Sequence, residues 1–214
     1  MELRRYTYAD AVTVRPMLLD IHDEVYSGYP DPFHSRDKFS YFVDLWSGRE
    51  DWRCVAGWEG ESPVGYAYGS KLKPGGWWKG AVRPAGVRGR IFALSELMVR
   101  SRWRGTGRAR QIHDALLDSA GSGLTDKLDF VTLLVDATHP KVRALYEAWG
   151  YEAGGECASS DGSPTYTVMV RPLRSSRPPE RPARPRRTSG HTEGVSQEGR
   201  PGAGRPQDCP GGAP

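Results

Sequence analysis

A glycine-bearing turn between a strand and a helix is the feature that most constrains this chain. The apolar run from Ile91 to Val99 predicts a strand, and Arg108 to Ser119 has the pattern of a helix. Residues 102–107 between them read Arg-Trp-Arg-Gly-Thr-Gly, and the glycines let the backbone approach a ligand closely. The first N–H groups of the helix lack intrahelical partners and face the turn, where the helix dipole favours negative charge. The segment therefore predicts a site for a phosphate-bearing ligand.

Arginine is concentrated around this turn. Between residues 88 and 110 the single acid is Glu96, and the arginines are Arg88, Arg90, Arg100, Arg102, Arg104, Arg108 and Arg110. Guanidinium groups bind phosphate in a bidentate fashion, although such a run is more often a solvated charged face. Because the arginine run coincides with the glycine turn, we favour phosphate binding over a solvated charged face. The turn lacks the Gly-Lys-Ser/Thr of a mononucleotide loop and the third glycine of a dinucleotide fingerprint.

Two blocks of the sequence together resemble a known enzyme family. The run from Leu97 to Gly107 contains Arg-x-x-Gly-x-Gly and resembles the acyl-CoA pyrophosphate loop of the GCN5-related N-acetyltransferase (GNAT) superfamily. About thirty residues further, the block from His139 to Tyr151 is similar to that superfamily's later helix and the strand after it. An apolar strand at 129–135 separates the blocks, as in the family. The resemblance covers roughly residues 2–173.

The resemblance implies an α/β fold with a mixed, mostly antiparallel central sheet of about seven strands and with about four helices. In the family two central strands splay apart, and acetyl-CoA, the cosubstrate, lies in the gap and pairs with free backbone groups. The residues expected to bind it here are Leu97, Met98, Val99, Arg102, Arg104, Gly105, Thr106, Gly107, Arg108, Ala109 and His139. His139 stands where the family commonly has Asn, and an imidazole can also donate or accept a hydrogen bond. The alternative for His139 is a polar loop residue before a helix.

Two residues are candidates for the chemistry. By the resemblance, Tyr146 lies opposite the thioester sulfur, and a phenol with a pKa of about 10 suits protonation of a thiolate leaving group. Glu96 interrupts an otherwise apolar strand and is the candidate general base, directly or through water. A backbone N–H near 97–99 is the candidate donor to the oxyanion. The alternatives are a packed aromatic for Tyr146 and an ion pair with a nearby arginine for Glu96.

The acceptor side is expected on the first two helices and on the loop before Ile91. Acids and aromatics there suit an amine by charge pairing and cation–π contact, or are solvent-facing acids and packing aromatics. They are Asp20, Asp23, Glu24, Tyr26, Tyr29, Asp31, Asp37, Trp77 and Trp78. The two tryptophans lie between glycines and are interpreted as a candidate lid. His22, His34 and Asp23 rival Glu96 as the base.

The leading interpretation is an N-acetyltransferase that moves an acetyl group from acetyl-CoA to the primary amine of a small molecule by direct attack on the thioester. The insertion at 73–89 favours a covered pocket over the open groove that a protein or peptide acceptor needs. Acetylation of a protein N-terminus or lysine is an alternative. A non-catalytic acyl-CoA-binding regulatory module is another, against which the presence of both Tyr146 and Glu96 argues.

Composition divides the chain into a domain, residues 1–173, and a tail, residues 174–214. The tail has eight prolines, seven glycines and Val195 as its single large apolar residue, so it is predicted to be disordered. Its eight arginines and four acids account for the chain's net charge of +4 and leave the domain formally neutral. Specific nucleic-acid binding by the domain is therefore not implied.

Cysteine use and hydropathy indicate a cellular location. Cys54, Cys157 and Cys209 show neither metal-ligand spacing nor a disulfide pattern, which fits a reducing compartment and no metal site. The N-terminus lacks an apolar signal core, and no run approaches the roughly 20 apolar residues of a membrane span. We expect a cytoplasmic protein without membrane association, and a homodimer is left open.

Periodicity along the chain predicts the order strand, two helices, three antiparallel strands, helix, strand, helix and two strands. The expected strands are 2–7, 53–59, 63–72, 91–99, 129–135, 151–158 and 165–173. Helices are expected at 8–26, after Ser35 as a cap, from 107 and at 140–149. Pro16 predicts a kink or a division of the first helix.

Overall fold

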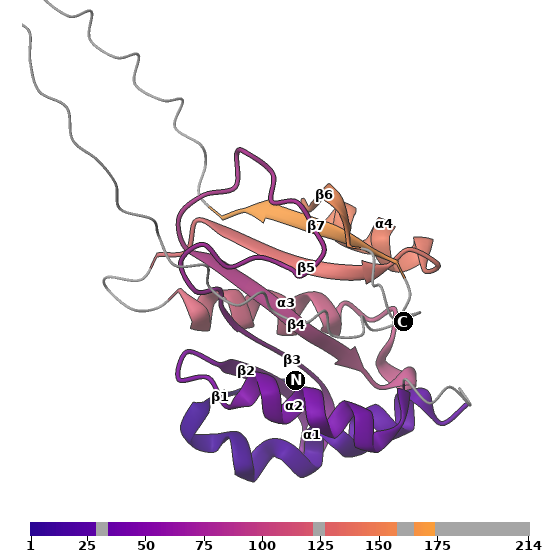
Figure 1. Cartoon of the computed structure of the whole chain (residues 1–214). Coiled ribbons are helices and arrows are strands. Elements are labelled where there is room, and N and C mark those ends of the chain that lie inside the picture. The colour runs from indigo at the N-terminus through magenta and orange to yellow at the C-terminus, as the bar shows by residue number, and fades with distance from the viewer. Residues whose placement is uncertain (29–33, 122–126, 158–164, 174–214) are drawn as a thin grey trace, which may run out of the picture.

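The fold is a seven-stranded sheet covered on both faces, as seen in the computed structural model, which describes residues 1–28, 34–121, 127–157 and 165–173 (Figure 1). The strand order is β1-β2-β3-β4-β5-β7-β6. The strands are β1 (Glu2–Thr7), β2 (Arg53–Glu59), β3 (Ser62–Lys71), β4 (Ile91–Val99), β5 (Phe130–Asp136), β6 (Glu152–Cys157) and β7 (Tyr166–Pro172). The helices are α1 (Ala11–Tyr26), α2 (Arg36–Ser47), α3 (Arg108–Ala120) and α4 (Pro140–Ala148). The expected α/β fold and element order are confirmed. The predicted tail lies outside the described residues.

The two central strands separate along their length. Neighbouring strands of the sheet pair antiparallel except β4 and β5, which are parallel. Those two pair over only three positions, the last joining Ala93 to Thr132, although β4 continues to Val99. Beyond Ala93 the edge of β4 that faces β5 therefore has no strand partner. This is the splayed sheet that the resemblance implied.

A bulge bends β4 where it leaves β5. In the pairing with β3, Glu96 lies opposite Tyr68 while Leu94 lies opposite Gly69, so Ser95 has no opposite residue. An extra residue of this kind increases the local twist and redirects the side chains that follow. The bulge thus sets the direction of Glu96 at the start of the gap.

Two hydrophobic layers hold the sheet. One lies under α1, α2 and the segment 73–89, and the other lies under α3 and α4. Figure 1 shows α1 and α2 together on one side of the sheet, away from α3. Because the strands β4 and β5 are buried on both faces, β4 reads as a continuous apolar run broken by Glu96.

Local signals explain the helix boundaries. The Ser35 hydroxyl accepts a hydrogen bond from the backbone N–H of Lys38, which confirms the predicted cap of α2. A 3-10 turn at Tyr8–Asp10 precedes α1, and α1 then runs unbroken through Pro16. The first helical segment is therefore divided before Ala11 and not at the proline.

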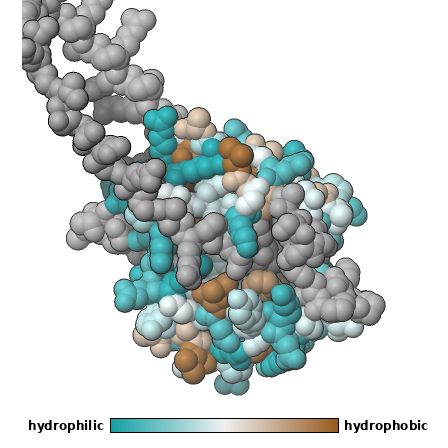
Figure 2. Space-filling view, in the orientation of Figure 1, coloured by the Kyte–Doolittle hydropathy of each residue, from teal (hydrophilic) through white to brown (hydrophobic). Residues whose placement is uncertain are grey.

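Figure 2 shows one face of the molecule, coloured by hydropathy. Hydrophobic residues there are scattered over a mostly hydrophilic surface, as is normal for folded domains. In the described ranges of the chain, each helix is too short or too polar to cross a membrane. The cytoplasmic location and the oligomeric state stay predictions.

Candidate functional site

A groove of about 400 Å³ runs between the glycine turn and α4. Of the residues predicted to bind the cofactor, those that line it are Leu97, Met98, Val99, Arg104, Gly105, Gly107, Arg108 and Ala109, together with Tyr146. It is lined as well by residues that sequence reasoning missed, which are Val25, Trp103, Arg110, Val142, Leu145 and Trp149. Four of these missed residues carried a signal: Trp103 lies inside the turn motif, Arg110 belongs to the arginine run, and Val142 and Trp149 lie four residues before and three residues after Tyr146 on the same helical face.

The turn has the geometry of an anion cradle. Gly105 and Gly107 have φ of +74° and +79°, the left-handed region that glycine adopts without strain. Gly107 is also the N-cap of α3, so the unpaired N–H groups of that helix begin directly after it. A Cβ placed on either glycine would meet no protein atom within 4 Å. The backbone around the turn is therefore open to a ligand.

Arginines next to the turn are held in place by neighbours. The guanidinium of Arg104 donates to the carbonyl of Val99 at 3.2 Å, and that of Arg108 lies 2.7 Å from a carboxylate oxygen of Glu59. Arg102 and Arg108 both lie over the ring of Trp103, at 5.5 and 5.8 Å from its centroid. The groove thus has a cationic rim with restrained side chains.

Three of the expected cofactor residues are not among those that line the groove. Arg102 is exposed, and the hydroxyl of Thr106 donates to the carbonyl of Trp103 at 2.6 Å. His139 precedes α4, and its Nδ1 lies 3.5 Å from a carboxylate oxygen of Asp136. Their part in cofactor binding stays a prediction.

Glu96 and Tyr146 meet at the gap between β4 and β5. Both line a cavity of about 20 Å³, which also touches Leu133 and Leu134 of β5. A volume of this size holds about one water molecule. The cavity adjoins the groove, since both are lined by Leu97, Val142 and Tyr146. The structure therefore brings the two candidate catalytic residues together, from a strand and a helix 50 positions apart in the chain.

Glu96 is a buried carboxyl without a cationic partner. Its side chain accepts a hydrogen bond from the N–H of Leu97 at 3.2 Å, and in the part of the chain that the structure describes no arginine pairs with it. Burial raises its pKa to about 8, and the Leu97 N–H opposes that rise only partly. The ion pair considered as an alternative is not formed. A carboxyl with this pKa suits proton transfer near neutral pH.

Tyr146 is the single buried side chain of α4. Its ring makes edge contacts with Trp149 and Tyr151, each at a centroid distance of 5.4 Å. Burial raises the pKa of its phenol, and the nearby Glu96 adds to the effect. The phenol is therefore held in its protonated form, which is the form that a proton donor needs.

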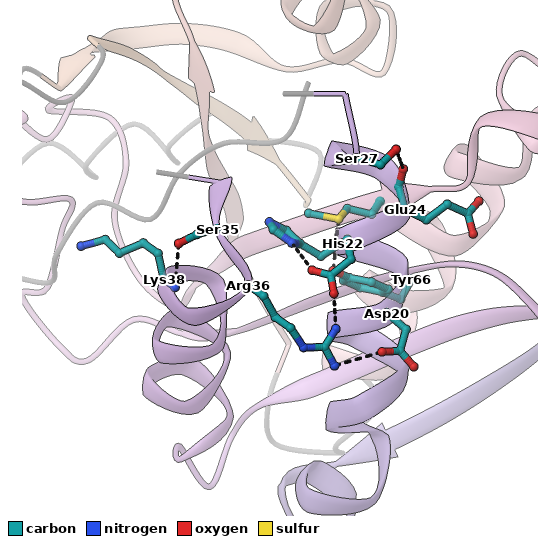
Figure 3. A network of polar contacts seen from close by, with 10 residues as sticks. Asp20, His22, Glu24, Ser27, Ser35, Arg36, Lys38 and Tyr66 are labelled. Carbon is teal, nitrogen blue, oxygen red and sulfur yellow. Dashed lines mark hydrogen bonds and ion pairs between the residues drawn. The ribbon is translucent and has the colours of Figure 1, made fainter. Parts of the chain in front are cut away.

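Three acids of the expected acceptor side have arginine partners, and Figure 3 shows Arg36 between α1 and α2. Arg36 bridges Asp20 and Asp23 between α1 and α2, with 3.0 Å to the Asp20 oxygen. Glu24 lies 3.2 Å from the Nε of Arg100. These carboxylates are engaged within the protein, which favours the structural alternative for them. Tyr29 and Asp31 lie outside the described residues.

The rival base His22 is part of the packing. Its ring is buried and stacks on Phe39 at a centroid distance of 3.9 Å, and its Nδ1 lies 3.5 Å from an Asp23 oxygen (Figure 3). Burial lowers its pKa, against the opposing effect of Asp23. Beside it, the Tyr66 hydroxyl donates to the sulfur of Met98 at 3.2 Å.

The position of Trp78 favours the packing alternative over the lid. That side chain is 2 % exposed, and its Nε1 donates to the Thr132 hydroxyl at 3.0 Å. Thr132 is the residue at which the pairing of β4 and β5 ends. The next residue, Lys79, accepts a hydrogen bond at its carbonyl from the Cys157 thiol at 2.7 Å. The segment 73–89 is therefore attached to β5, where its pairing with β4 ends, and to the outer strand β6.

Comparison with known proteins agrees with this geometry. Residues 16–151 match the sequence profile of the Acetyltransferase (GNAT) family. The structure is similar to aminoglycoside 6'-acetyltransferase type Ii, with 17% identity and a TM-score of 0.56 over 83% of this chain and 100% of that one. It is similar to the ribosomal-protein-S18-alanine N-acetyltransferase from Escherichia coli, with 14% identity and a TM-score of 0.55 over 82% and 96%.

An acetyltransferase from Thermus thermophilus is 22% identical, with a TM-score of 0.51 over 80% of this chain and 96% of that one. At these identities the likeness shows the fold and not the substrate. A comparison with curated proteins found no match.

Proposed function

The chain belongs to the GNAT acetyltransferase family, and on this premise we propose that it moves an acetyl group from acetyl-CoA to the primary amine of a small molecule. One observation carries the proposal. The groove that begins at the glycine turn ends at a cavity lined by both Glu96 and Tyr146. A site for the diphosphate and a pair of groups for proton transfer are thereby joined.

The cosubstrate binds along the groove. The first N–H groups of α3 and the turn at Gly105 and Gly107 hold its diphosphate, with Arg104 and Arg108 at the rim. Its arm lies against the apolar side chains of α4 and along the part of β4 that β5 leaves unpaired. The thioester then reaches the cavity at Glu96 and Tyr146. Holding it there beside the amine supplies much of the rate by proximity.

Proton transfers accompany the movement of the acetyl group. Glu96 takes one proton from the ammonium, through a water molecule in the cavity, and later releases it to solvent; the free amine attacks the thioester carbonyl. A backbone N–H of β4 at 97–99 stabilises the oxyanion of the tetrahedral intermediate. When the C–S bond breaks, Tyr146 donates its proton to the sulfur and recovers one from the nitrogen through solvent. The products are an acetamide and free coenzyme A.

The covered acceptor side supports a small acceptor. The segment 73–89 is anchored by Trp78 and Lys79, and the acids of α1 are engaged with arginines. The names of similar structures include both an aminoglycoside and a protein acetyltransferase, so the acceptor class is a matter for experiment.

The test measures thiol release from acetyl-CoA across a panel of small amines and peptides. Tyr146→Phe should lower kcat about 100-fold while the Kd for acetyl-CoA changes less than about twofold, because the phenol acts only as the sulfur departs. Tyr8→Phe, which alters an exposed tyrosine, is the control and should change neither.

Each other outcome has a definite meaning. Equal losses of kcat and affinity in Tyr146→Phe would assign Tyr146 a structural role. Turnover confined to peptides would establish a protein acceptor, and binding of acetyl-CoA without turnover of any amine would establish a regulatory module.

A further inference from the structure

A hydrogen-bonded array, buried at two of its three members, lies behind Tyr146 and takes no part in the reaction described above. It joins Asp114, His113 and Tyr151. The Nδ1 of His113 lies 2.8 Å from a carboxylate oxygen of Asp114, and its Nε2 lies 2.8 Å from the Tyr151 hydroxyl. His113 is completely buried and Tyr151 is 2 % exposed. The array connects α3 to the residue that follows α4, across 38 positions of sequence.

The proton positions follow from the partners. Asp114 is ionised, because hydrogen bonds from Arg110 and His113 outweigh the effect of its burial and lower its pKa. An ionised carboxylate accepts, so the Nδ1 of His113 carries the proton. The Nε2 lone pair then accepts the O–H of Tyr151. Each polar atom of the array has a partner, and the tautomer is determined.

The surrounding charges keep His113 neutral. Burial lowers its pKa to about 4, since the opposing effect of Asp114 is smaller and Arg110 and Arg171 disfavour a further positive charge. Arg110 lies 2.7 Å from Asp114 on the same helix, and Arg171 reaches it from β7 at 4.0 Å. The third member of the array, Tyr151, has a phenol whose pKa is raised by burial. The array is therefore intact at neutral pH.

Tyr151 is the link from the array to Tyr146. The two rings meet at an interplanar angle of 72°, and the backbone N–H of Tyr151 donates to the Tyr146 carbonyl at 3.1 Å. Trp149 packs against both the imidazole and the phenol, at 4.9 Å from the His113 ring and 5.4 Å from the Tyr146 ring. Tyr146 is the single buried side chain of the nine-residue α4, so Tyr151 and Trp149 are direct packing partners of the residue that anchors this helix to the core.

We propose that His113 is a positioning residue, which fixes Tyr151 through its hydroxyl and so holds the Tyr146 phenol toward Glu96 in the gap. The catalytic part of this inference rests on the proposed function, whereas the geometric part does not. His113→Leu removes both hydrogen bonds, Tyr151→Phe removes one, and His113→Gln keeps a carbonyl oxygen that can accept from Tyr151.

The first experiment needs no acceptor. In the wild type, the His113 Nδ1 proton should give a downfield proton NMR resonance that His113→Leu lacks. The ionisation of Tyr146 is then followed by ultraviolet absorbance. The titration curve of each protein is corrected by subtracting the curve of the same protein with Tyr146→Phe added. In the wild type the phenol should ionise only above the usual tyrosine pKa of about 10, because burial raises its pKa. In His113→Leu it should ionise about one pH unit lower, because the loosened ring gains solvent.

The second experiment separates positioning from stability. His113→Leu and Tyr151→Phe should lower kcat about tenfold with the KM for acetyl-CoA within about twofold, and His113→Gln should recover part of kcat. Ile112→Val, a buried neighbour on the same helix, is the control that loses packing but keeps the array, and it should retain kcat.

Three results would overturn the inference: no downfield proton, an unchanged Tyr146 titration in His113→Leu, or a kcat loss in Ile112→Val equal to that in His113→Leu. If the wild type acetylates no amine, the proposed function fails, and the titration still decides whether the array positions Tyr146.

Discussion

At the scale of single residues, the proposed reaction depends on the protonation state of Glu96. The carboxyl lies in a gap between strands with the N–H of Leu97 as its polar contact and no arginine beside it among the described residues. Burial raises its pKa to about 8, so the carboxyl is largely protonated at pH 7. A base must be deprotonated to accept a proton, and the reactive fraction therefore grows as the pH rises.

We expect kcat to rise with pH to a plateau above a midpoint near the Glu96 pKa of about 8. Glu96→Gln should lower kcat by about 100-fold and abolish that midpoint. The stability of the folded protein depends on pH in the opposite sense. The pKa of Glu96 is higher in the folded protein than in the unfolded chain. Its contribution to the free energy of unfolding is therefore fully present below the unfolded pKa and is lost as the pH rises through about 8. At about pH 9 the Glu96→Gln protein should therefore be more stable than the wild type by about 1–2 kcal/mol, and at about pH 4 it should not.

Rate profiles and urea unfolding at the two pH values check both parts. A midpoint that persists in Glu96→Gln would assign the base to another group.

Gly107 is a residue-scale test of the anion cradle. Gly107→Asp should weaken acetyl-CoA binding by about 100-fold or more, because a carboxylate then faces the diphosphate. The matched control is Gly75→Asp, since Gly75 has almost the same φ, +77° against +79°, and equally open surroundings for a Cβ. The two variants should lose similar stability, and only the first should lose affinity in calorimetry. Equal affinities would show that the turn does not hold the diphosphate.

At the scale of elements, the segment 73–89 is bound to the sheet by two hydrogen bonds. Trp78 donates to Thr132 where β4 and β5 part, and the Lys79 carbonyl accepts from Cys157. Both contacts join the segment to the β5–β7–β6 half of the sheet. The segment is therefore fixed to that half of the sheet by one contact next to the three paired positions of β4 and β5 and by a second contact at the outer strand.

Trp78→Phe should destabilise the fold by about 1–3 kcal/mol, through lost volume and a lost hydrogen bond. Trp77→Phe is the control, because in the described residues the buried Nε1 of Trp77 has no hydrogen-bond partner to lose. It should cost less in urea unfolding. A movable lid would give the reverse pattern, with a changed KM for the acceptor and little change in stability.

At the scale of the whole molecule, charge and fold are separated along the chain. Residues 174–214 account for the net charge of +4, while the described sheet and the candidate site lie within residues 1–173. Each residue of the groove and of the gap comes from the neutral part.

A protein that ends at Leu173 should keep its melting temperature within about 2 °C and its kcat within about twofold, since no site residue is removed. It should bind cation-exchange resin more weakly than the full chain, because the net charge falls to zero. Calorimetry, turnover and chromatography check the three expectations. Loss of turnover with an unchanged melting temperature would assign the tail a part in the site.

Much of this architecture was predictable because its signals are local. The apolar run of β4, the Ser35 cap and the glycines before α3 each depend on neighbours within a few residues. The boundaries of the strands accordingly agree with expectation to within about two residues. The same holds for most of the groove, since its turn is one continuous stretch of sequence.

The tryptophans and acids of the acceptor side were not predictable in the same way. Two tryptophans between glycines have the same local sequence pattern whether they cover a site or fill a core. The core position of Trp78 is seen only in its hydrogen bond to Thr132, which is 54 positions away in the sequence. Asp20 is equally able to attract an amine or an arginine until α2 brings Arg36 against it.

The sequence by itself determined the order of the elements, the glycine turn and the resemblance to a family of acyltransferases, because periodicity and backbone freedom are properties of neighbouring residues. Only the tertiary structure decided that Glu96 meets Tyr146 and that His113 lies behind it. These contacts depend on the bulge at Ser95, on the separation of β4 from β5 and on the hydrophobic layer that α3 and α4 share. Side chains far apart in the sequence come into contact only when the helices pack on the sheet.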